Sequence, residues 1–260
     1  NGSLFGGNDI KRAVQTGQAP IGERLISAHA NENPLFGVDS IPFLATSFDA
    51  SEKLWGAARE EMTKVLDEQN LVYLYAVPWP AQGLYAKKDI NSAAAPAGVK
   101  FRAYNAATAR IAELAGMAPV QIEAAELSQA LATGVVESFI SSGATGVDSK
   151  VWEQLTHFYN VQAWLPRNLV MANKDAFNAL DDATRAAING CAEKAASDGL
   201  ARVKELAGGY LKTLEETGMT VAAPGEALAA DLGGYGETMT NEWLDKAGDA
   251  GKAIIEAYRN

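Results

Sequence analysis

The sequence ALATG at residues 130–134, followed by an apolar strand that ends at Ser141, points to the fold class of this chain. Small residues closed by a glycine are typical of a helix that stops and turns into a buried strand. The sequence AVQTG at residues 13–17, followed by a strand that ends at Ser27, has the same form about 117 residues earlier. Two copies of one α/β unit predict two similar lobes. The alternative is coincidence, because helix, glycine and strand follow one another in many α/β proteins.

Outward from these two units, strands rich in β-formers alternate with longer Ala-rich amphipathic segments. This alternation is typical of an α/β protein. A long helical region begins at the capping residues Asp181 and Asp182, and Gly208 and Gly209 are expected to bend or split it. The expected strands cover residues 21–27, 71–77, 99–104, 135–140 and 168–173, and the expected helices cover residues 9–16, 51–69, 106–116, 124–133, 150–156, 175–180, 181–218 and 241–258.

The composition excludes several classes of protein. The chain has 260 residues, of which 48% are hydrophobic and 21% charged, as in ordinary globular proteins. A net charge of -10 makes nucleic acid and anionic membrane surfaces poor partners. The single cysteine, Cys191, excludes an internal disulfide and a cysteine-based metal cage. No apolar run reaches the roughly 18 residues of a membrane span, and the first residues lack the pattern of a secretory signal.

Signatures of catalysis are absent from the sequence. There is no glycine-rich dinucleotide motif, no phosphate-binding loop, no nucleophile elbow and no zinc-protease motif. The two histidines, His29 and His157, are expected in different lobes, and Cys191 lies in a helical pattern without a basic neighbour. We therefore expect no catalytic residue, no metal site and no cofactor, and we expect a binding protein rather than an enzyme.

An arginine inside an apolar strand is the strongest candidate for a binding residue. The sequence GVKFRAYN at residues 98–105 places Arg102 in a strand that leads directly into a helix. A buried guanidinium keeps its charge and has to meet an anion. One interpretation is a structural pair with Glu113 or Glu126. The other is a clamp on a ligand carboxylate, whose two oxygens match the guanidinium fork, with N–H groups of the helix that opens at about Ala106 nearby.

Two loops follow predicted strands at the edge where open α/β sheets bind ligands. The first, PWPAQG at residues 78–83, presents an indole and an amide on a turn stiffened by two prolines. The second, SSGATG at residues 141–146, is rich in hydroxyls. Trp164 adds an aromatic ring just before the strand at Asn168. Each of these features also occurs in ordinary turns and cores.

At this point the chain resembles the solute-binding proteins of TRAP (tripartite ATP-independent periplasmic) transporters. The resemblance implies two α/β lobes with a cleft between them and a long lobe-spanning helix, closing over an organic acid that is delivered to a membrane permease. It also implies a periplasmic location. The matching sequences, which cover almost the whole chain in order, are IPFL at residues 41–44, GVKFR at 98–102, ELSQALATGVVE at 126–137 and NLV to NK at 168–174.

Carried over by position, Arg102 matches the arginine that pairs with the ligand carboxylate in this family. Gln82 stands where some members have a second arginine, and Ser141 and Leu165 stand where sialic-acid binders have polar side chains. These departures favour a smaller or partly apolar acid, such as a hydroxy, keto or aromatic acid, over a sugar acid. The expected ligand-binding residues are Arg102, Gln82, Trp79, Tyr104, Asn105, Ser141, Ser142 and Trp164.

The resemblance also implies a division of the chain. Residues 1–98 are expected mostly in lobe 1, residues 99–173 mostly in lobe 2, and residues 174–260 in a helical segment that packs on both. Family members carry a signal peptide and a strand, a helix and a second strand before the position of Asn1, so these elements are expected to be missing. An enzyme or a sensor module on the same scaffold is the alternative. Some members bind a cation beside the carboxylate, but no ligand cluster here requires one.

Overall fold

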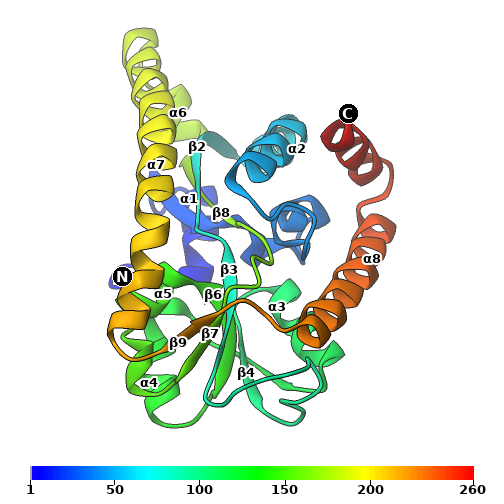
Figure 1. Ribbon diagram of the computed structural model, residues 1–260. Coiled ribbons are helices and arrows are strands. Elements are labelled where there is room, and N and C mark those ends of the chain that lie inside the picture. Colours follow the sequence, from blue (N-terminus) through cyan, green and yellow to red (C-terminus); the bar gives the residue numbers. More distant parts are fainter. Residues whose placement is uncertain (1) are drawn as a thin grey trace.

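The computed structural model describes residues 2–260 as a mixed α/β structure with two separate sheets. Figure 1 shows the smaller sheet above the larger one, with helix α7 running alongside both and helix α8 on the opposite side. No helix in residues 2–260 has the length and apolar character needed to cross a membrane. The two-lobed α/β architecture expected from the sequence is confirmed.

The first sheet has three strands in the order β1-β8-β2. The central strand β8 (Arg167–Asn173) pairs antiparallel with both β1 (Ile21–Leu25) and β2 (Leu71–Pro78). Helix α2 (Phe48–Glu68) covers this sheet and begins at Ser47, whose side chain accepts a hydrogen bond from the Ala50 amide. The core beneath it includes Leu54, Met62, Leu66, Leu71, Leu169 and Met171.

The second sheet has six strands in the order β5-β4-β6-β3-β7-β9. Strand β4 is parallel to β5 and β6, whereas β3 is antiparallel to β6 and β7, and β7 is parallel to β9. The aromatic rings of Tyr85 and Phe139 stack 4.4 Å apart in its core. The strands are β3 (Gln82–Ala86), β4 (Lys100–Ala103), β5 (Ala118–Gln121), β6 (Ser138–Ser142), β7 (His157–Tyr159) and β9 (Thr220–Ala222).

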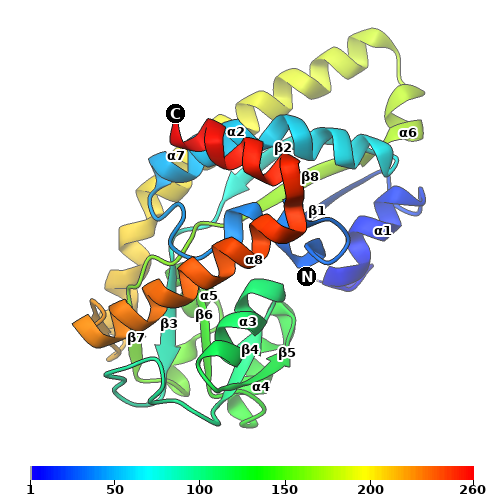
Figure 2. The same cartoon turned by 90° about the vertical axis from the view of Figure 1, so that its right-hand side faces the viewer.

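Two long helices connect the sheets. Helix α7 (Asp182–Glu216) packs against β2 of the first sheet and against α5 (Gly143–Asp148), which lies beside the second sheet. Helix α8 (Glu226–Arg259) is kinked at Gly248 (Figure 2). The remaining helices are α1 (Ile10–Gln15), α3 (Ala106–Leu114), α4 (Leu127–Ala132), α5 (Gly143–Asp148) and α6 (Lys174–Asn178), with 3-10 turns η1 (Gly7–Asp9), η2 (Ile26–His29), η3 (Pro34–Ser40), η4 (Ala124–Glu126) and η5 (Val151–Glu153).

Several expectations from the sequence are wrong in detail. Strands β3, β5, β7 and β9 were not expected, because each has only three to five residues and too little alternation to be recognised. Residues 143–148 form a helix instead of a loop, whereas only a short 3-10 turn forms in residues 150–156. Helix α7 is unbroken at Gly208 and Gly209, where a side chain would meet no other atom within 4 Å. Helix α8 begins at Glu226 rather than at residue 241.

Strand β3 lies between β6 and β7 and leaves no room for a side chain at Gly83. A Cβ atom at this position would lie 2.2 Å from the Cζ atom of Phe158. We expect Gly83→Ala to lower the free energy of unfolding by about 1–3 kcal/mol, the usual cost of overpacking. Urea denaturation measures the change.

Gly56→Ala is the matched control, because a Cβ at position 56 of α2 meets nothing within 4 Å. Alanine is the better helix former, so this variant should gain a few tenths of a kcal/mol up to about 1 kcal/mol. Equal stability of the two variants would contradict the tight packing described for Gly83.

Candidate functional site

A cavity of about 170 Å³ lies between the two sheets. Its walls include Glu23, Arg24 and Asn168 from the first sheet and Gln82, Arg102 and Ser141 from the second, and we call it the central cavity. Charged and amide side chains from both sheets therefore line one cavity, as in typical sites for small polar molecules.

Arg102 is the buried cation of the central cavity. The residue is 3% exposed, its Nε donates to the carbonyl of Ile122 at 3.0 Å, and its guanidinium lies 4.9 Å from the centre of the Tyr104 ring. Burial lowers the pKa of Arg102 to about 10, which still leaves the group charged at neutral pH. Within residues 2–260 the guanidinium makes no ion pair with a carboxylate.

The structural pair considered for Arg102 is therefore not formed. Glu113 pairs with Arg110 at 3.1 Å, and Glu126 accepts a hydrogen bond from the backbone amide of Glu123. The two terminal nitrogens of Arg102 have no hydrogen-bond acceptor in the described part of the chain. A buried guanidinium with free donors at a cavity wall can bind an external anion.

A chain of hydrogen bonds holds the aromatic ring beside Arg102. The indole N–H of Trp164 donates to the Tyr104 hydroxyl at 3.2 Å, which donates to Oε1 of Gln82 at 3.1 Å. The Gln82 amide in turn donates to the carbonyl of Pro80. Burial raises the pKa of the Tyr104 hydroxyl above its usual range, so this group keeps its proton. These hydrogen bonds fix the position of the Tyr104 ring and therefore of the Arg102 guanidinium beside it.

The expected binding residues fall into two groups. Arg102, Gln82, Trp79, Tyr104 and Ser141 line the central cavity together. The other three, which lie outside its lining, are Asn105, Ser142 and Trp164: Asn105 caps α3 beside a second cavity, Ser142 caps α5 and is fully buried, and Trp164 is 1% exposed in the core. Leu165 is also a buried core residue.

In the second cavity, of about 890 Å³, several of the lining polar groups already have partners. The Lys11 ammonium lies 2.5 Å from Glu32, and Nδ1 of His29 lies 2.7 Å from the same carboxylate. Asn105 donates to the hydroxyls of Ser27 and Ser40. These contacts join α3 of the second lobe to residues that follow β1, and Ala106 at the start of α3 lines this cavity rather than the central one.

Trp79 is fixed at the wall of the central cavity by two residues that sequence reasoning missed as site residues. Its indole N–H donates to Oδ1 of Asn168 at 2.8 Å, and the Asn168 amide donates to Glu23 at 2.9 Å. Glu23 and Asn168 lie on the neighbouring strands β1 and β8, where Asn168 is in register with Leu25, and a side-chain hydrogen bond joins them, a relation that sequence does not reveal. The three side chains form a continuous polar wall opposite Arg102.

Arg24 and Glu123, also missed, form an ion pair between the two lobes. Arg24 lies in β1, whereas Glu123 follows β5 of the second sheet, and two N–O distances are 3.3 Å. The side chains are 12% and 27% exposed, and both line the central cavity. Arg24 could have been found from the sequence, because it lies in an expected strand just as Arg102 does.

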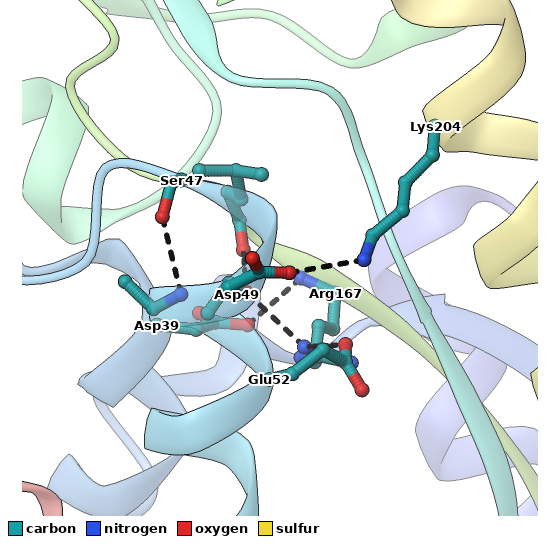
Figure 3. A network of polar contacts seen from close by, with 9 residues as sticks. Asp39, Ser47, Asp49, Glu52, Arg167 and Lys204 are labelled. Carbon is teal, nitrogen blue, oxygen red and sulfur yellow. Dashed lines mark hydrogen bonds and ion pairs between the residues drawn. The ribbon is translucent and has the colours of Figure 1, made fainter.

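Beneath the cavity, Arg167 joins the start of β8 to the start of α2. Figure 3 shows Arg167 between Asp39 and Glu52, with Lys204 of α7 reaching Asp49 nearby. The Arg167 amide donates to Asp39 at 2.8 Å, and its guanidinium lies 2.5 Å from Glu52. Burial raises the pKa of Asp39 to about 6 although the Arg167 amide and charge oppose the shift. The residues on either side of Arg167, Pro166 and Asn168, line the central cavity.

No cluster of histidine, cysteine, aspartate or glutamate suited to a metal ion occurs among residues 2–260. Cys191 is exposed and unpaired in the described chain. The central cavity therefore offers charge, hydrogen bonds and an indole ring, which are means of binding.

Comparison with known proteins places this geometry in context. Residues 1–232 match the family model described as bacterial extracellular solute-binding protein, family 7. A search among curated protein sequences found no match.

Among the solved structures that match this chain, three are more than 40% identical to it and cover at least 99% of it. A TRAP solute-binding protein specific for pyroglutamate, from an unidentified microbe of a marine metagenome, is 54% identical over 99% of this chain and 85% of its own, with a TM-score of 0.98. Two Bordetella pertussis extracytoplasmic solute receptors binding pyroglutamic acid, DctP6 and DctP7, are 46% and 41% identical. Both cover 100% of this chain and 86% of their own, with TM-scores of 0.98 and 0.99.

The raised pKa of Asp39 predicts a pH dependence of stability. Between about pH 4 and pH 6 the folded protein binds the Asp39 proton more tightly than the unfolded chain does, so stability from this group falls as the pH rises. We expect lowering the pH from about 7 to 5 to add about 1 kcal/mol to the free energy of unfolding through Asp39.

Asp39→Asn should remove this contribution while keeping an oxygen that can accept from the Arg167 amide. Urea denaturation of both proteins at pH 5 and pH 7 measures the difference. If the native protein and Asp39→Asn differ in free energy of unfolding by the same amount at pH 5 and at pH 7, Asp39 does not titrate in this range.

Proposed function

The chain belongs to the bacterial extracellular solute-binding protein family 7, the DctP family, and on that premise we propose that its ligand is pyroglutamate. It is a periplasmic receptor that binds a small organic acid for a TRAP transporter permease. The family is one of transport proteins, and we propose that this member has no catalytic activity of its own. The single observation that carries the ligand proposal is the free, buried guanidinium of Arg102.

Pyroglutamate matches the central cavity group by group. It has one carboxylate, a lactam N–H donor and a lactam carbonyl acceptor on a small five-membered ring. Arg102 can take the carboxylate in a bidentate pair. The polar wall of Trp79, Asn168 and Glu23 supplies acceptors and donors for the lactam edge. The three solved relatives all bind this acid, which supports the proposal.

We assign the expected binding residues to two roles. Arg102, Gln82, Trp79, Tyr104 and Ser141 line the cavity and would contact the ligand. The remaining three would support these residues without contacting the ligand. Trp164 donates to the Tyr104 hydroxyl, and Ser142 caps the helix that follows Ser141. Asn105 joins α3 to the first lobe.

We also propose how the chain is divided between the two lobes. Residues 1–98 would contribute mostly to lobe 1, residues 99–173 mostly to lobe 2, and residues 174–260 to both. Strands β3 and β8 are the exceptions, since β3 pairs within the second sheet and β8 within the first. The chain passes between the sheets after β2 and before β8, beside Trp79 and Pro166, so both connections border the central cavity.

A thermal-shift and calorimetric comparison tests the ligand. Pyroglutamate at a hundred times its dissociation constant should stabilise the protein by about 2.7 kcal/mol, a shift of a few degrees for a chain of this size. Its primary amide and 2-pyrrolidone keep the lactam but lack the carboxylate, and proline keeps the carboxylate but lacks the lactam carbonyl. Stabilisation by pyroglutamate alone is the expected result, whereas equal stabilisation by 2-pyrrolidone would exclude a carboxylate clamp.

Arg102→Ala tests the clamp itself. Loss of one partner of a buried charge pair should weaken pyroglutamate binding by about 2–5 kcal/mol in calorimetry. Arg59→Ala is the control, because Arg59 is exposed on α2 and lines none of the cavities described above. Unchanged affinity in the Arg102 variant would rule out this residue as the carboxylate partner.

A further inference from the structure

We propose that Glu123 restricts this receptor to ligands with a single carboxylate by neutralising Arg24, a second arginine of the central cavity. The inference rests on the proposed function, because it concerns the charge of the acid that Arg102 binds. It assigns a role in specificity to Glu123, whose ion pair is with Arg24 and not with Arg102. The argument depends on the position, the partners and the burial of Arg24 and Glu123.

Arg24 enters the central cavity from the lobe opposite Arg102. Its side chain is 12% exposed, and its Nε atom is buried without a hydrogen-bond partner in residues 2–260. Its terminal nitrogens contact Glu123 and the side-chain oxygen of Asn8. Glu123 is therefore the carboxylate that balances a largely buried guanidinium.

The pair between Arg24 and Glu123 lies at the wall of the central cavity. Both N–O distances are 3.3 Å, longer than the 2.7–2.9 Å usual for strong charge-assisted bonds of this type. A Cβ atom at Gly7 would lie 2.6 Å from both Arg24 Nη1 and Glu123 Oε2, so the backbone of residue 7 covers the pair on one side. The other side borders the central cavity, from which a ligand carboxylate could approach.

The charged side chains that line the central cavity are two arginines, Arg24 and Arg102, and two glutamates, Glu23 and Glu123. Arg24 is balanced by Glu123, and the exposed Glu23 accepts a hydrogen bond from Asn168, which leaves Arg102 without a carboxylate. Burial lowers the pKa of Arg102, while the charge of Glu123 raises it and that of Arg24 lowers it, so the three groups act on one another. The cavity thus leaves the guanidinium of Arg102 for one ligand carboxylate.

Without Glu123, Arg24 would be a second buried cation that lacks a partner. Leaving a buried charge unpaired is costly, and a second ligand carboxylate would remove that cost. A dicarboxylate that the native cavity rejects should then bind between Arg24 and Arg102. Glutarate is a suitable probe, because it has the five-carbon chain of pyroglutamate and a carboxylate at each end.

Calorimetry of the purified protein with pyroglutamate and with glutarate tests the inference. Glu123→Gln should bind glutarate at least about tenfold more tightly than the native protein does, the effect of one charge-assisted interaction. The gain for glutarate should exceed any change in the affinity for pyroglutamate, so the ratio of the two affinities should shift toward glutarate. Glu126→Gln is the matched control, because it removes the same charge three residues away, lies outside the cavity lining and keeps an oxygen for the Glu123 amide.

Two further variants test whether the gain depends on Arg24 and provide a replacement if Glu123→Gln does not fold. Arg24→Gln combined with Glu123→Gln should lose the gain for glutarate, because the gain requires the freed guanidinium. If Glu123→Gln does not fold, Glu123→Ala serves in its place, with thermal unfolding as the check. A gain for glutarate no larger than that for pyroglutamate, or one that persists in the double variant, would overturn the inference.

Failure of the inference can be told from failure of the proposed function. A native protein that binds pyroglutamate, combined with a Glu123 variant that gains nothing for glutarate, contradicts only the role of Glu123. A native protein that binds no pyroglutamate contradicts the proposed function, and the inference then fails with it.

Discussion

The central constraint on this structure is the burial of the Arg102 guanidinium without a carboxylate of the protein beside it. A group that stays charged at neutral pH is held between the Ile122 carbonyl and the Tyr104 ring. Much of the surrounding structure serves this placement: the hydrogen-bond chain through Trp164 and Gln82 orients the ring, and β4 carries the arginine into the cavity wall. The protein keeps an unbalanced charge in its interior, which an anionic ligand can balance.

The fold was largely predictable because strong local patterns specify it. The helix, glycine and strand sequence expected to end at Ser141 and its counterpart expected to end at Ser27 both form, with Gly17 and Gly134 in the left-handed conformation. The strands end at Ser142 and at Leu25, because Ile26–His29 turns into a 3-10 helix. The short strands β5 and β9 were not predictable, since each lies at an edge and is defined by its neighbour rather than by its own alternation. The long helix α8 was underestimated because glycines interrupt its first half.

The site was predictable where a residue broke a local rule, or where the family resemblance indicated a position, as for Gln82 and Ser141. Arg102 was recognised because a charge inside an apolar strand requires a partner, and Trp79 because two prolines present it. Glu123 was not, because its role depends on Arg24, 99 positions away in the sequence and on the other lobe. Asn168 was likewise found only when the hydrogen bonds to Trp79 and Glu23 became visible. A contact between side chains of two lobes cannot be predicted from the local sequence of either segment.

The continuity of α7 has a mechanical consequence. Its 35 residues form an unbroken rod of about 50 Å, which rests on β2 of one sheet and on α5 beside the other. A continuous helix bends far less readily than a loop, so a displacement of one lobe is transmitted to the other through a shared stiff support. The rod therefore limits the directions in which the two walls of the cavity can be displaced relative to each other.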